Sequence, residues 1–261
     1  MNDWLHNLPV LWMALVIFGF TYLVSGMIYA TVIVLAAGKR ARSFKAVSPG
    51  MLPPLGIIFG LFVAFTAAQV WSDNDRASAT VNREASALRA VVVLAASFPG
   101  EPEARLRGLV RRYIEEAATQ EWPTMARRTA TLRMTPRPLA EALELTLALA
   151  PSGQGQQIAQ REIATALENV FDARGQRIII SGSQVNFVKW SCLLLQAVCA
   201  LLAIAMVHSD DQLTAVITMG IFATGVAASV LLIAAHDRPF MGEISVGPDP
   251  LLQVMPEAEA S

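Results

Sequence analysis

The sequence predicts an all-α membrane protein: a four-span transmembrane helical bundle with a helical extramembrane domain inserted between spans 2 and 3. Four apolar runs lead to this prediction, because an α-helix needs about 20 apolar residues to cross the roughly 30 Å hydrocarbon core of a bilayer. A hydrophobic content of 54% agrees with a membrane protein. The runs occupy residues 10–37, 51–71, 187–207 and 213–235.

The first run is predicted to be a membrane span and not a signal peptide. In residues 1–7 the only charged side chain is that of Asp3, so the basic start of a signal peptide is missing. A short basic loop with a turn then leads to the second run. Pro53 and Pro54 fall in the first turn of that run, where the backbone N–H that proline lacks would have no acceptor within the helix.

The polar centre, residues 72–186, is predicted to be a helical domain. No glycine or proline occurs between Gly60 and Pro99, so we expect the second span to continue out of the membrane as one long helix. A later helical face is expected to lead through residues 174–186 into the third span. Between these, apolar residues at helical spacing predict an amphipathic helix with one buried stripe. The stripe consists of Leu106, Leu109, Val110, Tyr113, Ile114 and Ala117.

The residues that could carry chemistry do not form a catalytic or metal-binding set. The sequence has no Gly-rich phosphate loop and no metal-spaced His/Cys set, so we expect no enzyme activity, no cofactor and no metal site. A net charge of −1 gives no reason to expect a nucleic-acid partner. Cys192 and Cys199 are expected to be buried thiols between helices, and Gln196 is expected to hydrogen-bond to a neighbouring helix.

One row of the second span is the strongest candidate for a functional site. Five residues recur every four positions and change from apolar to amide to carboxylate along the helix. The row can be ordinary packing or lipid contact, or it can line a pore in an oligomer. In the second case the apolar rings would gate by dewetting, and a carboxylate ring would favour cations. The row consists of Ile57, Leu61, Phe65, Gln69 and Asp73.

The segment Leu52–Asp75 resembles the second transmembrane helix of bestrophin channels. That helix has a proline, a glycine six residues later and a tryptophan before its polar extension, here Pro54, Gly60 and Trp71. A second segment, residues 236–242, is similar to the one that follows the last helix of bestrophins. Its matching positions are Asp237, Pro239, Phe240 and Gly242. The nearest kin by this resemblance are bacterial bestrophin-like proteins of unassigned function.

The resemblance implies a pentameric homo-oligomer that passes inorganic ions, with Ile57 and Leu61 at the neck of the pore. Pro53 stands where the family has a bulky apolar neck residue. The acidic cluster that binds calcium in animal bestrophins has no dense counterpart here, so calcium gating is not implied.

The charges beside the spans favour opposite membrane orientations. A basic loop at Lys39, Arg40, Arg42 and Lys45 favours one side as cytoplasmic. More basic residues flank the spans on the other side, namely Arg76, Arg83, Arg89, Arg174, Arg177, Lys189 and Arg238. The resemblance implies an inner or plasma membrane protein with the helical domain and both termini in the cytoplasm, including the tail at residues 236–261.

Two functions of different classes are compatible with this sequence. One is an ion channel in which the second span lines the pore. The alternative is a non-conducting membrane scaffold or sensor whose helical domain binds a partner protein. The channel places Ile57 and Leu61 on an oligomer axis, whereas the scaffold would bury their row inside one subunit.

Overall fold

The computed structural model describes residues 8–36 and 48–257, and all regular structure in these ranges is helical. Four helices are long and apolar enough to cross a membrane, which confirms the predicted all-α, four-span architecture. The basic loop at Lys39–Lys45 lies outside the described residues. The four candidate spans lie within Val10–Leu35, Pro49–Ala95, Phe187–Val207 and Gln212–His236.

The chain divides into two compact units. The first, called the membrane unit here, comprises Met1–Ser72, Gln184–Arg238 and Gly242–Ile244. The second, called the helical unit, comprises Asp73–Ser183, Pro239–Met241 and Ser245–Ser261. Helix α3, Leu52–Ala95, belongs to both units and is uninterrupted, as the absence of helix breakers predicts.

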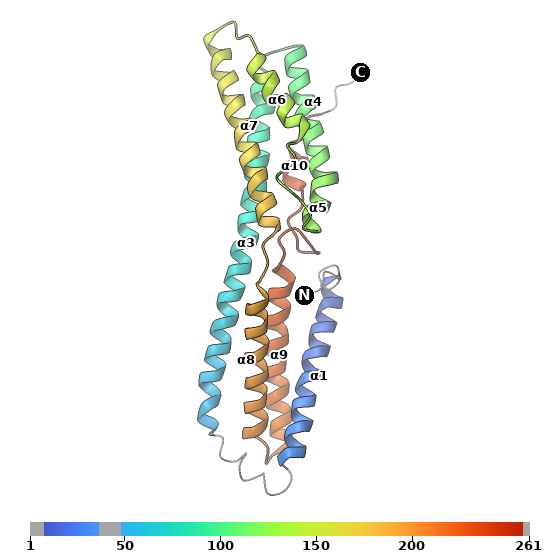
Figure 1. Cartoon of the computed structure of the whole chain (residues 1–261), viewed down its shortest axis with the longest axis vertical. Coiled ribbons are helices and arrows are strands. Elements are labelled where there is room, and N and C mark those ends of the chain that lie inside the picture. The colour runs from blue at the N-terminus through green and yellow to red at the C-terminus, as the bar shows by residue number, and fades with distance from the viewer. Residues whose placement is uncertain (1–7, 37–47, 258–261) are drawn as a thin grey trace. The chain divides into compact units, whose positions relative to one another are not determined.

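The membrane unit is built from α1 (Val10–Ala36), the first part of α3, α8 (Phe187–Val207) and α9 (Gln212–His236). Figure 1 shows these segments running side by side along their length. Small and branched side chains from all four fill two apolar clusters, with the rings of Phe59 and Phe222 5.7 Å apart at their centroids.

Helices α8 and α9 each begin at a side-chain cap. The carboxylate of Asp211 accepts hydrogen bonds from the backbone N–H groups of Leu213 and Thr214 at the start of α9. The amide oxygen of Asn186 accepts a hydrogen bond of 2.9 Å from the Val188 N–H at the start of α8. The first backbone N–H groups of each helix are therefore satisfied by a side chain that directly precedes the helix.

The expected helical passage into the third span is wrong. Helix α7 (Gln154–Ser181) ends at Gly182, and α8 begins only at Phe187. Within this break, the carboxylate of Asp237 accepts a hydrogen bond of 2.6 Å from the Val185 N–H. A remote residue thus satisfies a backbone donor that a continuous helix would have used internally.

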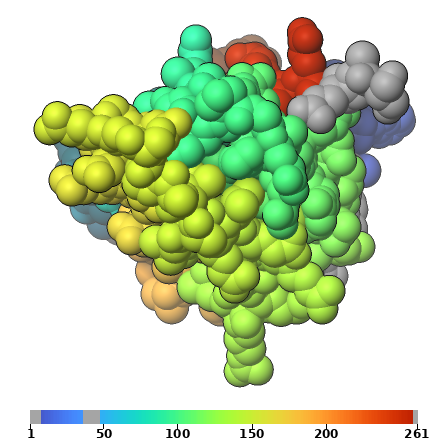
Figure 2. Space-filling model, turned by 90° about the horizontal axis from the view of Figure 1, so that it is seen from above, coloured from blue at the N-terminus to red at the C-terminus, as the bar shows by residue number. Residues whose placement is uncertain are grey.

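The helical unit surrounds one apolar core. It contains the second part of α3, α4 (Glu101–Glu116), a π-helix (Ala117–Glu121), α5 (Trp122–Ala126), α6 (Arg137–Ala148), α7 and α10 (Asp249–Gln253). The stripe predicted on α4 is buried in this core, from Leu106 to Ala117. The Gln156 amide donates to the Ser97 carbonyl at 2.8 Å, which ties the start of α7 to the turn after α3. Figure 2 shows the helical unit from above.

Three small expectations about the third span need correction. Cys192 is half-buried and Cys199 is exposed, so neither is a fully buried thiol. The Gln196 Oε1 atom is buried but has no hydrogen-bond partner among the described residues. Residues that pack α8 against its neighbours are the small and branched Leu193, Ala197 and Leu201.

Candidate ion pathway

The apolar part of the predicted pore row lies on an exposed side of α3. Ile57 is 69% exposed, Leu61 is 54% exposed and Phe65 is 68% exposed. The other side of α3 presents Phe59 and Val70, which pack in the apolar cluster of the membrane unit. Each of these three side chains therefore has more than half of its surface free of contacts within the described chain.

The polar end of the row has a partner that the sequence did not indicate. The Lys189 ammonium, at the start of α8, donates a hydrogen bond to the Gln69 side-chain oxygen. The two residues are 120 positions apart in the sequence. This contact places a cationic group beside the row, where only an amide and a carboxylate were expected.

The remaining row residue, Asp73, lies in the helical unit. Its carboxylate is 23% exposed and lies 4.0 Å from the Arg76 guanidinium, one helical turn further along α3. An exposed pair at this spacing contributes only a few tenths of a kcal/mol. The Asp73 charge is therefore partly balanced by its own helix.

The family-motif residues of α3 are exposed in the single chain. Pro54 lies in the first turn of the helix, and Trp71 is 48% exposed. A Cβ atom added to Gly60 would meet no heavy atom within 4 Å. Packing inside one subunit therefore does not require glycine at this position.

The motif after α9 has residues in both units. In the membrane unit, buried Asp237 holds the Val185 backbone, and Gly242 adopts φ 99°, a conformation that favours glycine. In the helical unit, Phe240 is 4% exposed and packs edge-on against Trp122 at 6.0 Å between centroids. The Pro239 carbonyl accepts a hydrogen bond of 2.7 Å from the Val246 N–H. These contacts give the motif a packing role in each unit.

The helical unit contains a buried ion-pair network that the sequence analysis missed. The fully buried Arg177 guanidinium donates to both oxygens of buried Glu84, at 2.7 and 3.0 Å. It also donates to Glu121 at 3.0 Å and lies 4.3 Å from the centroid of the Trp122 ring. Arg174 donates to the same Glu121 carboxylate, with an Nε distance of 2.7 Å. Two guanidinium groups are thus balanced by two carboxylates.

Burial and charge shift two pKa values in this network. Burial opposes the charged form of Arg177, but the adjacent Glu84 carboxylate outweighs it and raises the pKa of Arg177 above its ordinary range. Tyr113 donates a hydrogen bond from its hydroxyl to Glu84. Burial, followed by the Glu84 charge, raises the pKa of Tyr113 well above its ordinary value.

The arginines of this network were misread from the sequence. Arg174 and Arg177 were counted as charges that flank the third span, yet both are buried. Their pairing with Glu84 and Glu121 spans 53 to 93 positions, so no local pattern indicated it. In the part of the chain that the structure describes, no group of three or more His, Cys, Asp and Glu side chains is arranged to hold a metal ion.

Comparison with known proteins identifies the family. The model of the "Bestrophin-like domain" matches residues 18–251. No curated protein matches the sequence. Among solved structures, a bacterial bestrophin homologue from Klebsiella pneumoniae with a mutation I180T is 14% identical, with a TM-score of 0.74, and the match covers 91% of this chain and 97% of that one. The homologue from the same organism solved by Zn-SAD phasing is 13% identical, with a TM-score of 0.70 and coverages of 90% and 95%. At such identities the structural likeness shows a shared fold, whereas the family model extends over most of the sequence. The chain therefore belongs to the bestrophin-like family.

Proposed function

We propose that this chain is the subunit of a homo-oligomeric ion channel, a pentamer as the family resemblance implies, in which α3 lines the pore. The observation that carries the proposal is the exposed row of Ile57, Leu61 and Phe65. Around an oligomer axis, these side chains would form successive apolar rings.

Stacked apolar rings have a definite physical consequence for an ion. A narrow apolar constriction loses its water, and an ion can cross it only by shedding part of its hydration shell. Widening the constriction restores water and lowers that barrier. Ile57 and Leu61 are the proposed neck, and Phe65 is a proposed third ring.

The scaffold alternative expects this row to be buried inside one subunit. Its three apolar side chains, Ile57, Leu61 and Phe65, are instead more than half exposed. A row that faced lipid would also be exposed, so the oligomeric state and the current are the measurements that separate the two functions.

We further propose that the protein lies in the inner or plasma membrane, with the helical unit and both termini in the cytoplasm. The acidic hairpin at Asp210 and Asp211 would then lie outside. Maleimide labelling of a cysteine introduced at Asp210, in intact cells with a membrane-impermeant reagent, tests this orientation.

The channel proposal is tested with Leu61→Ala and a matched control, Leu195→Ala. Leu195 is 63% exposed on α8 and lies in the same unit. We expect the purified protein to have an oligomeric mass in detergent and to pass current in planar bilayers. Leu61→Ala should raise the conductance, because every subunit loses a side chain from the same ring, whereas Leu195→Ala should leave it unchanged.

Two results would overturn the channel. One is a stable monomer in detergent that passes no current under any ion gradient. The other is a current that responds equally to both leucine substitutions, which would place the Leu61 row away from the pathway.

A further inference from the structure

We propose that the helical unit contains a binding site for a small zwitterion, of the size of an amino acid or a short peptide, in a cavity between α4 and α7. The cavity has a volume of about 540 Å³ and lies wholly inside this unit. Small-molecule sites in proteins commonly have volumes of about 300–1,000 Å³. The proposal concerns binding alone and stands whether or not the protein conducts ions.

The wall of the cavity includes an irregular stretch of helix. Ala117, Gln120 and Glu121 line it and belong to the π-helix between α4 and α5. Single π-turns inside longer helices are rare and frequently occur at functional sites. Here the turn brings Gln120 and Glu121 to the same cavity.

A second irregularity lies at the start of the segment that covers the cavity. Arg128 has φ 59°, the left-handed region that a residue with a side chain seldom adopts. From Thr129 to Pro136 the chain then forms no helix and supplies several lining residues. Such strain persists only where the surrounding structure enforces it, and it is concentrated at ligand sites.

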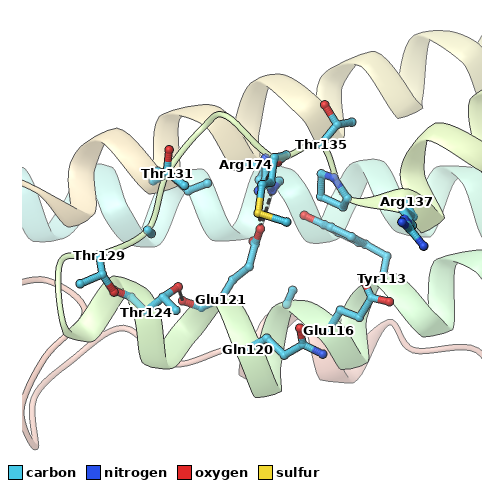
Figure 3. Close-up of a pocket in the computed structure, with 15 residues that line it drawn as sticks. Tyr113, Glu116, Gln120, Glu121, Thr124, Thr129, Thr131, Thr135, Arg137 and Arg174 are labelled. Carbon is cyan, nitrogen blue, oxygen red and sulfur yellow. Dashed lines mark hydrogen bonds and ion pairs between the residues drawn. The ribbon is translucent and has the colours of Figure 1, made fainter.

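Arg174 is a pre-oriented donor in this cavity. It is 7% exposed, and Glu121 binds it through Nε and Nη2 while the Met134 carbonyl accepts from Nη2 at 3.2 Å. Its third nitrogen, Nη1, has no hydrogen-bond partner among the described residues. Figure 3 shows the Arg174 guanidinium held by Glu121 within the set of lining residues. A donor fixed in this way binds a ligand without first losing rotamer freedom.

The charges that remain at the cavity are of both signs. Arg137 and Glu116 line it, but neither forms an ion pair with the other or with another side chain in the part of the chain that the structure describes. Thr135 and Gln120 likewise line the cavity and have side chains without hydrogen bonds in these ranges. The lining thus offers an unpaired cation, an unpaired anion and two neutral polar groups.

A zwitterion is the ligand class that satisfies this lining. A carboxylate would pair with the Arg137 guanidinium, whose fork of N–H donors matches its two oxygens. An ammonium group would pair with the Glu116 carboxylate. Arg137 is exposed and Glu116 is half-buried. A ligand with a single charge would form a charge-assisted hydrogen bond with only one of these side chains, whereas a zwitterion forms one with each.

Thermal unfolding of the full-length protein in detergent tests the site. The probes are L-alanine, L-glutamine, L-glutamate and the dipeptide L-Ala-L-Ala, with acetate and methylammonium as single-charge comparators. We expect at least one zwitterion to raise Tm saturably, whereas acetate and methylammonium leave Tm unchanged at the same concentration.

Two variants and two matched controls assign the effect to the cavity. Arg137→Gln and Glu116→Gln should each raise the apparent Kd of the zwitterion about tenfold or more. Arg133→Gln and Glu144→Gln change exposed residues of the same unit outside the cavity and should bind as the unmodified protein does. Because Arg137 and Glu116 make no ion pair, both variants should melt normally without ligand.

Three outcomes overturn the proposal. They are no saturable shift with any zwitterion in the panel, unchanged binding in both cavity variants, and a shift with acetate as large as the shift with the zwitterions. The last outcome would make the cavity an anion site.

Discussion

Removing Arg177 is expected to destabilise the helical unit more than removing any exposed arginine. In Arg177→Met, a side chain of similar length without charge replaces a guanidinium that is fully buried. The change deletes two hydrogen bonds to Glu84, one to Glu121 and the contact with the Trp122 ring. Glu121 keeps Arg174 as a partner, whereas buried Glu84 keeps only the Tyr113 hydroxyl.

The size of the effect follows from the charge left behind. Leaving one member of a buried ion pair without its partner costs about 3–5 kcal/mol. A change of 1 kcal/mol moves Tm by roughly 2–4 °C in chains of 150–250 residues. We therefore expect Tm of the Arg177→Met protein to fall by roughly 6–20 °C.

The assay is thermal unfolding of the purified protein in one detergent at neutral pH, with Arg161→Met as the control. Arg161 is exposed on the same helix, α7, so its replacement should change Tm by little. The double variant Arg177→Met/Glu84→Gln removes the orphaned charge and should lose less stability than the sum of the two single variants.

The reasoning is refuted by either of two results. The first is a Tm for Arg177→Met as close to the unmodified protein as that of Arg161→Met. The second is strict additivity in the double variant, because that would mean that Glu84 and Arg177 do not interact energetically.

Three further predictions test other contacts. Tyr113→Phe should lower the free energy of unfolding by about 1–2 kcal/mol at neutral pH, because Glu84 loses a hydrogen-bond donor. The raised pKa of Tyr113 means that the folded state keeps the hydroxyl proton after the unfolded chain has lost it, so the stability of the unmodified protein should fall as the pH rises above about 10. Denaturant titrations at pH 7 and 11 should show a smaller loss of stability in the Tyr113→Phe protein. In asymmetric salt, Lys189→Gln should shift the reversal potential of the current towards the equilibrium potential of the cation, because the variant loses the positive charge next to Gln69. An unchanged reversal potential would place Lys189 away from the pathway. Phe240→Ala should cost about 3–5 kcal/mol, measured by thermal unfolding, because it empties a buried site against Trp122, whereas Phe240→Leu should cost less.

The parts of this fold that the sequence predicted are those governed by local physics. A bilayer core accepts only long apolar helices, so each of the four spans is recognisable from composition and length alone. The stripe of α4 is recognisable because a helix that buries one side must repeat apolar residues at helical spacing. The continuation of α3 beyond the membrane span follows from residues 61–95, which contain no glycine or proline.

The break before α8 shows where local reasoning was insufficient. Gly182 and Asn186 are residues that commonly end and begin helices, but the apolar pattern around them favoured a continuous helix. The bond from the Val185 N–H to Asp237 stabilises the non-helical backbone. That acceptor comes from a residue 52 positions away, so its contribution cannot be read from the neighbouring sequence.

By itself, the sequence determined the all-α class and the four candidate membrane spans, and it predicted the row of α3 that is the proposed ion pathway. Only the tertiary structure decided that Arg174 and Arg177 are buried, that Lys189 donates a hydrogen bond to Gln69 and that a cavity lies between α4 and α7. The reason is that the free energy of burying a charge depends on its partner. A lone arginine in a sequence belongs on the surface, and only when the chain folds does a carboxylate 93 positions away make its burial possible.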